Sequence, residues 1–201
     1  AAQSAPDPRA RLFAAKGLAK AGLPLDPGLA ADADLYVRAE YAAAEGAGLK
    51  DRSAHVRAAA ADYYAKKPAN APAAELVKMA LEDSPLPRGQ ALLALAKLPP
   101  SPEAAAALAA ARAAEPWWVR AKGYEAGAAA EPVALAGLAD KDPRVAAAAL
   151  EAFNAASPEK AKAAWTKVLR DPKAPLELLG TAVDIAAAAG PDGVRPLLDA
   201  L

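Results

Sequence analysis

Residues 142–153 read DPRVAAAALEAF, and this stretch decides the fold class. It begins with an aspartate, a residue type whose side chain accepts hydrogen bonds from the free backbone N–H groups at a helix start. The proline after it suits the first helical position, where no backbone N–H is needed. An apolar, alanine-rich run follows, so the stretch predicts a capped helix with a large apolar surface.

The same kind of start recurs along the chain at intervals of about 30 residues, which is typical of repeat proteins. The other segments that share it are 7–18, 53–64, 84–95, 116–127 and 173–184. A second helical segment lies between consecutive starts, and the first of these is DLYVRAEYAAAEG at 34–46. The first interval is longer because it contains LPLDPGLAADAD, which predicts an irregular inserted loop near 22–34. The unit is therefore a helix–turn–helix pair.

This pattern resembles the HEAT-repeat family of α-solenoids, in particular its short bacterial-type repeats. The resemblance rests on the turn and helix start in LADKDPRVAAAALEAF and on the Val-Arg pairs at 56–57 and 119–120. It implies an all-α, right-handed solenoid of about six helix–turn–helix repeats, with roughly twelve helices in a single domain over residues 1–201. The last helix, 190–201, presents Val194, Leu197, Leu198 and Leu201 on one face, so we expect the array to continue or to pack on another domain.

Composition and charge exclude several classes of function. The 24 basic and 24 acidic residues give a formal net charge of zero, which argues against nucleic-acid binding because phosphate contacts need a positive excess. The chain has no cysteine, so it forms neither disulfides nor thiolate metal sites. No apolar run is long enough for a membrane span, and the first residues do not read as a signal peptide. The chain is expected to be soluble, in the cytoplasm or, after processing, in an export compartment, with its oligomeric state left open.

No residue pattern predicts a catalytic centre, a cofactor or a metal site. His55 is the only histidine, and its position at a helix start predicts a solvated side chain. Asp140 and Asp142 form a small acidic cluster, but Asp142 reads as a helix cap and Asp140 as a turn residue. Gly123 and Gly127 are spaced for close contact between helices and not for a phosphate loop.

Four arginines occupy equivalent positions near the helix starts, and they are Arg11, Arg57, Arg88 and Arg120. Stacked repeats place such residues in a column, which has two interpretations. In the first, each arginine bonds an acidic turn residue, the candidates being Asp51, Glu82, Asp140 and Asp171. In the second, the column is a cationic strip that binds an acidic peptide or another anion. The matching acidic column favours the first interpretation.

The adjacent tryptophans at 117 and 118 fall in columns of different character. The face of Trp117 is largely apolar, which predicts a side chain that covers a junction between helices. Trp118 shares a column with polar residues and is expected to be substantially exposed, as interface anchors are. Trp165 is predicted to lie in the core.

These observations favour a non-catalytic scaffold that binds a protein or peptide partner. The predicted contact residues are Trp118, Trp117, Arg88, Arg120 and Lys122. Two alternatives stay open. The chain could be an accessory repeat region of a larger enzyme, such as a peptidyl-prolyl isomerase or a peptidase, or a lyase-type HEAT-like protein.

Overall fold

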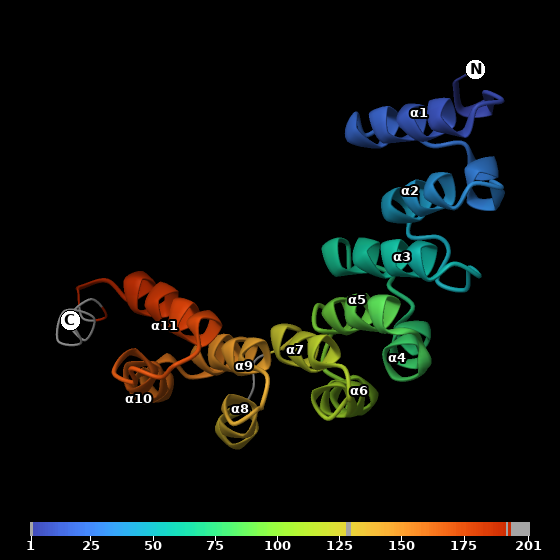
Figure 1. Ribbon diagram of the computed structural model, residues 1–201. Helices are drawn as coiled ribbons and strands as arrows, with labels where there is room; N and C mark the ends of the chain where they lie inside the picture. The colour runs from blue at the N-terminus through green and yellow to red at the C-terminus, as the bar shows by residue number, and fades with distance from the viewer. Residues whose placement is uncertain (1, 128–129, 192, 194–201) are drawn as a thin grey trace. The chain divides into compact units, whose positions relative to one another are not determined.

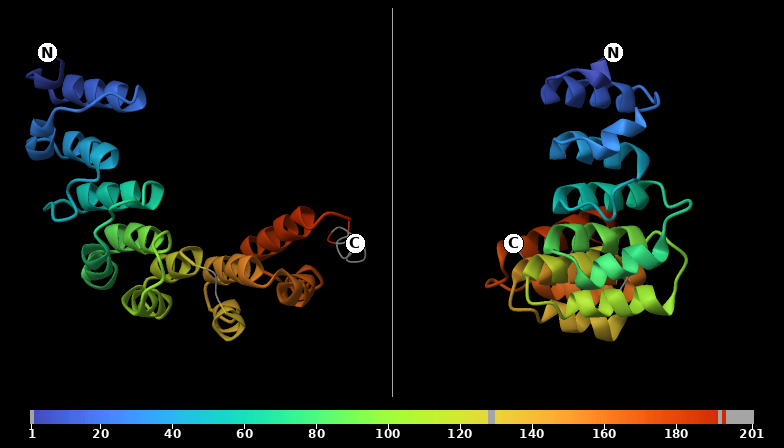
Figure 2. Two further views of the ribbon diagram at one scale, coloured as in Figure 1. Left: turned by 180° about the vertical axis from the view of Figure 1, so that it is seen from behind. Right: turned by 90° about the vertical axis from the view of Figure 1, so that its right-hand side faces the viewer.

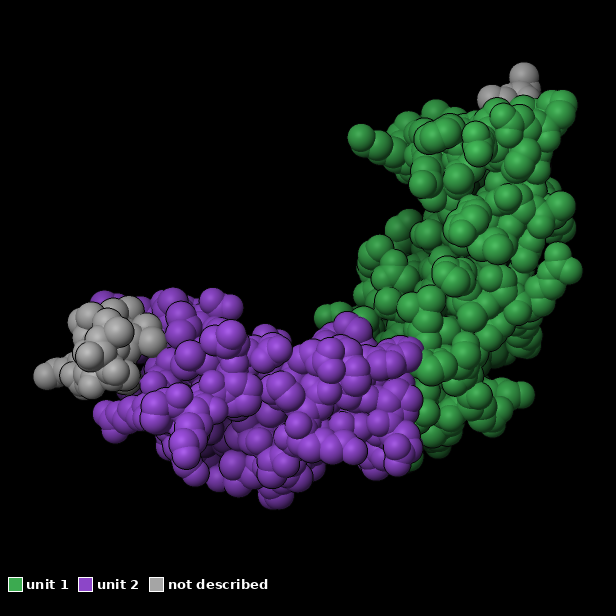
Figure 3. Space-filling model, viewed as in Figure 1, with its two compact units in different colours: residues 1–107 green, residues 108–201 purple. Residues whose placement is uncertain are grey.

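The computed structural model describes residues 2–127, 130–191 and 193. This part of the chain contains eleven α-helices and two short 3-10 helices and no β-strand, so the all-α prediction is confirmed (Figure 1). The helix predicted at 190–201, with its apolar face, lies almost wholly outside the described residues. Packing divides the chain into two compact units, residues 1–107 and 108–201, where the sequence predicted one domain (Figure 3). The boundary falls inside α6 (Pro102–Arg112).

The first unit is built around a row of helices that pack in order, each on the next, as both views of Figure 2 show. The members of this row are α1 (Pro8–Lys20), α2 (Leu35–Glu45), α3 (Ala54–Lys66) and α5 (Pro85–Leu95). A further helix, α4 (Ala73–Glu82), packs on α5. The core combines alanines with valines and leucines, among which Ala15, Val37 and Leu92 are fully buried.

The structure corrects the assignment of residues 22–46. The segment predicted as a loop near 22–34 contains a 3-10 helix, Pro27–Ala31, and its Leu29 is buried. The helix that follows is capped by Asp34, whose carboxylate accepts from the backbone N–H groups of Tyr36 and Val37. Since α2 packs between α1 and α3, residues 34–46 belong to the row and are not the second helix of a pair.

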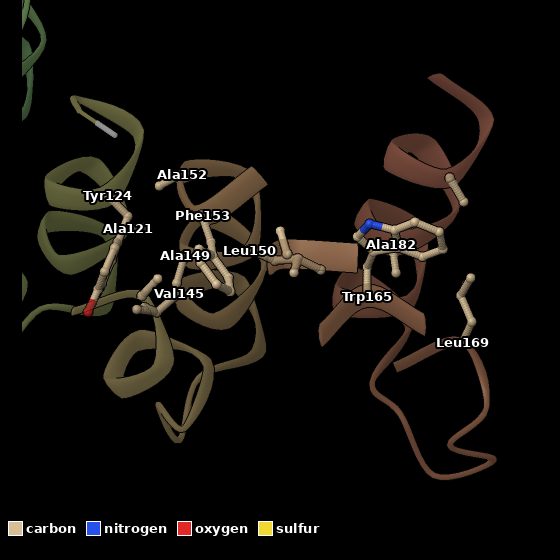
Figure 4. Packing of buried hydrophobic residues seen from close by; sticks show 14 residues of the cluster. Ala121, Tyr124, Val145, Ala149, Leu150, Ala152, Phe153, Trp165, Leu169 and Ala182 are labelled. Carbon is tan, nitrogen blue, oxygen red and sulfur yellow. The ribbon is translucent and has the colours of Figure 1, made fainter. Parts of the chain in front are cut away.

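The second unit has the same construction. Its row consists of α7 (Trp117–Glu125), α9 (Pro143–Ala156) and α11 (Leu176–Ala188). On the row pack α8 (Glu131–Leu138), which contacts α9, and α10 (Pro158–Leu169), which contacts α9 and α11. Figure 4 shows the core between them, where Phe153, Leu150 and Trp165 are surrounded by alanines. Trp165 is 2% exposed, which confirms its predicted place in the core.

Two glycines in this unit allow helices to approach closely. A Cβ on Gly137 would lie 2.5 Å from the ring of Tyr124 and 2.6 Å from the Cβ of Ala149, so only glycine fits between these side chains. A Cβ on Gly123 would lie 3.0 Å from the backbone nitrogen of Arg112 at the end of α6. The close contact predicted at Gly123 is therefore confirmed.

Candidate functional site

Arginines near the starts of the row helices reach forward to aspartates that precede the next row helix. Each uses Nε and Nη2 on the two carboxylate oxygens, in the two-pronged geometry that makes such pairs strong. The Nε–Oδ2 distances are 2.6 Å for Arg57–Asp83 and 2.8 Å for both Arg38–Asp51 and Arg120–Asp140. We call this set of pairs the ladder, and its members are Arg11–Asp32, Arg38–Asp51 and Arg57–Asp83 in the first unit and Arg120–Asp140 in the second.

In the first unit two of the three ladder aspartates, Asp32 and Asp51, each join two arginines. The Asp51 carboxylate binds Arg38, while its backbone carbonyl accepts from Nη1 of Arg57 at 2.7 Å. The Asp32 carboxylate binds Arg11, and its carbonyl accepts from Nη1 of Arg38, also at 2.7 Å. The ladder is therefore one connected chain of hydrogen bonds from α1 to α5. It also sets the helix starts of the row on the same side of the unit.

The ladder aspartates also shape the turns in which they lie. Oδ1 of Asp51 accepts the backbone N–H of Ser53 at 2.7 Å, and Oδ1 of Asp140 accepts that of Asp142 at 2.9 Å. In both cases the acceptor lies two residues before the capping residue of the next helix. This local bond fixes the carboxylate before the arginine arrives, so little side-chain freedom remains to be lost on pairing.

Electrostatics keep the ladder ionised at neutral pH. The hydrogen bond from Arg38 is the main cause that lowers the pKa of Asp51, and partial burial opposes it. The hydrogen bond from Arg120 lowers the pKa of Asp140 in the same way. The two arginine pKa values are raised by the same bonds. A carboxylate held as an anion by a fixed cation is unsuited to accept and release protons near neutral pH, so the ladder is structural.

This geometry supports the first interpretation of the arginine column and corrects its details. Arg57 pairs with Asp83 and not with the neighbouring Glu82. Arg38, which the sequence comparison had not aligned with the column, is its most buried member in the first unit at 6% exposure. Asp171 bonds the backbone N–H of Lys173, and no ladder arginine pairs with it among the described residues.

In the second unit the arginine of α9 does not extend the ladder to the next turn. Ala146 takes the arginine position on α9, and the arginine of this helix is Arg144, two residues earlier. Arg144 pairs with Asp142, the residue that caps its own helix, at 2.8 Å. Its guanidinium lies over the ring of Trp117, 3.3 Å from the ring centroid, which is a cation–π contact.

The described ranges contain no cluster of side chains typical of a metal site. Asp140 and Asp142, the pair considered for a cation, are each engaged by an arginine. No group of three or more histidine, aspartate or glutamate side chains with the geometry of a metal site occurs among the residues that the structure describes. His55 is exposed at the start of α3, as predicted.

The predicted contact residues occupy several environments. Arg120 is 8% exposed within the ladder, and Lys122 forms an ion pair with Glu125. Trp117 packs partly against the core cluster of the second unit, in agreement with its predicted covering role. Trp118 is half-buried, so the expectation of substantial exposure was wrong. Arg120 therefore has little free surface to offer, whereas Trp117 stays partly exposed.

Arg88, the remaining predicted contact residue, differs from the ladder arginines. It lies on α5 at the column position, but its side chain forms no ion pair with any residue in the described part of the chain. Its Nε is buried and has no hydrogen-bond partner there. Arg88 is therefore the one column arginine whose guanidinium is not neutralised within the described ranges.

A set of exposed side chains that the sequence comparison did not single out lies along the first unit. Each is the second residue after a helix cap, and the ladder places these helix starts on one side. We call them the N-terminal edge strip, and its members are Arg9, Tyr36, His55 and Leu86. Tyr36 is 61% exposed and Leu86 is 42% exposed. Tyr36 has the same place on α2 as the other members have on their helices, because α2 belongs to the row.

Comparisons with known proteins add no assignment: no family model matches the chain, and no curated protein matches it. In the described part of the chain, no helix combines the length and the hydropathy that crossing a membrane requires.

Proposed function

We propose that this protein is a non-catalytic scaffold, a right-handed solenoid of HEAT-like helical pairs that binds a protein partner. The repeated turn, the arginine that reaches the next turn and the row of helices packed in order support this proposal. A solenoid repeat contacts mainly its neighbours, so its stability comes from the interfaces between neighbouring repeats. The ladder pairs lie between neighbouring helices of the row and would stabilise such interfaces. Long rows of helices also offer extended surfaces on which a partner can lie.

The observation that carries the proposal is the N-terminal edge strip. Tyrosine and arginine are enriched among the side chains that dominate protein interfaces, whereas an isolated surface leucine or tyrosine is common and needs no explanation. Here the exposed Tyr36 and Leu86 recur at the same position of stacked helices, beside Arg9 and His55. Four helix starts thus present four large side chains along one edge of the unit.

The backbone beneath the strip is held before any partner arrives. Asp34 caps α2 next to Tyr36, and the ladder binds the turns before α2, α3 and α5. A partner that contacts the strip therefore loses little entropy by ordering it, which leaves more of the contact energy as affinity. Arg88 lies two residues after Leu86 on α5. It is a cation that is not neutralised within the described ranges, and it favours a partner with a carboxylate.

The test compares retention of partners by two matched double variants. The strip variant carries Tyr36→Ala and Leu86→Ala, and the control carries Phe13→Ala and Leu81→Ala, two exposed apolar side chains outside the strip. Each protein is immobilised, incubated with lysate of the source cells and analysed by mass spectrometry; retained proteins are then purified and titrated directly. We expect at least a tenfold loss of affinity in the strip variant alone. Equal affinity of the two variants, or no protein retained above an empty matrix, would refute the proposal.

A further inference from the structure

We draw no further inference here: the strongest candidate, the apolar groove between α8 and α10 that Leu135, Leu138 and Val168 line, has one lysine and one aspartate among its lining residues, and nothing in the structure shows what covers it.

Discussion

Replacing Arg38 by methionine tests whether the ladder holds the row together. Methionine keeps much of the aliphatic stem and removes four hydrogen bonds, two to the Asp51 carboxylate and two to the carbonyls of Asp32 and Ala33. The Asp51 side chain is 13% exposed, so its charge would be left largely enclosed without a cation.

The magnitude follows from how enclosed that charge is. Removing one partner of a fully buried ion pair costs about 3–5 kcal/mol, because the other charge stays uncompensated. Water reaches part of Asp51, and the N–H of Ser53 still binds its carboxylate, so the loss is smaller here. We expect Arg38→Met to lower the free energy of unfolding by about 2–3 kcal/mol.

The assay is equilibrium urea unfolding followed by far-ultraviolet circular dichroism. The matched control is Arg52→Met, because Arg52 is an exposed arginine in the same turn whose side chain makes no hydrogen bond within the described ranges. This control should change the free energy of unfolding by no more than about 0.5 kcal/mol. Adding Asp51→Asn to Arg38→Met removes the stranded charge and should recover part of the loss. If Arg38→Met and Arg52→Met unfold at the same urea concentration, the ladder does not stabilise the row.

Three further predictions concern packing and pH. Gly137→Ala should lower the free energy of unfolding by about 1–3 kcal/mol because the added methyl group meets the ring of Tyr124. Gly180, on α11, has open space around it, so Gly180→Ala should raise the free energy of unfolding by about 0.5–1 kcal/mol. Urea unfolding measures both effects. Trp165→Ala should cost about 3–5 kcal/mol in the same assay because the indole is 2% exposed in the core, and a small loss would place it at the surface. The hydrogen bond from Arg120 lowers the pKa of Asp140 in the folded protein. This carboxylate therefore stabilises the fold fully at pH values above its unfolded-state pKa of about 3.9. The stabilisation is lost as the pH falls through the lower folded-state pKa. Acid titrations of unfolding should therefore show a shallower loss of stability below about pH 4 in Asp140→Asn than in the wild type, and identical slopes would exclude this contribution.

The sequence predicted the helices well because their starts have a chemical signature. Asp7, Asp34 and Asp142 accept backbone N–H groups at helix starts, and Pro8 and Pro143 follow two of them, in the positions that the pattern indicates. Such signals act within one turn, so a single sequence suffices to find them. The place of a helix in the row is a different property, because it depends on what packs beside it.

The misplacement of α2 shows that limit. Its start, DLYVR, carries the same Val-Arg pair as the starts of α3 and α7, so Arg38 could have been aligned with the column. Spacing opposed this assignment, because the next start at Ser53 follows after fewer residues than a helix pair requires. The connection from α2 to α3 contains no helix, and only packing shows that α2 still lies in the row.

The sequence predicted that acidic turn residues pair with the arginines, but not which acidic residue pairs with each arginine. Both Glu82 and Asp83 precede the start of α5, and spacing alone does not separate them. The structure selects Asp83, whose carboxylate also binds the backbone N–H of Ser84. The exposure of a single side chain is harder to predict than its partner. Trp118 belongs to a column of polar residues and is nevertheless half-buried.

The alanine-rich core explains why this chain uses buried arginines at all. Among the residues that the structure describes, more than half of the buried apolar ones are alanines, and each buries far less apolar surface than a leucine would. Helices of alanine approach closely, yet the contacts between them are small and carry little information about register. A two-pronged arginine–aspartate pair is specific in direction and distance, so it fixes which turn meets which. On this reasoning the paired arginines of the ladder stabilise the fold, and Arg88, which has the column position but no ion pair within the described ranges, is the arginine of the column to examine for binding.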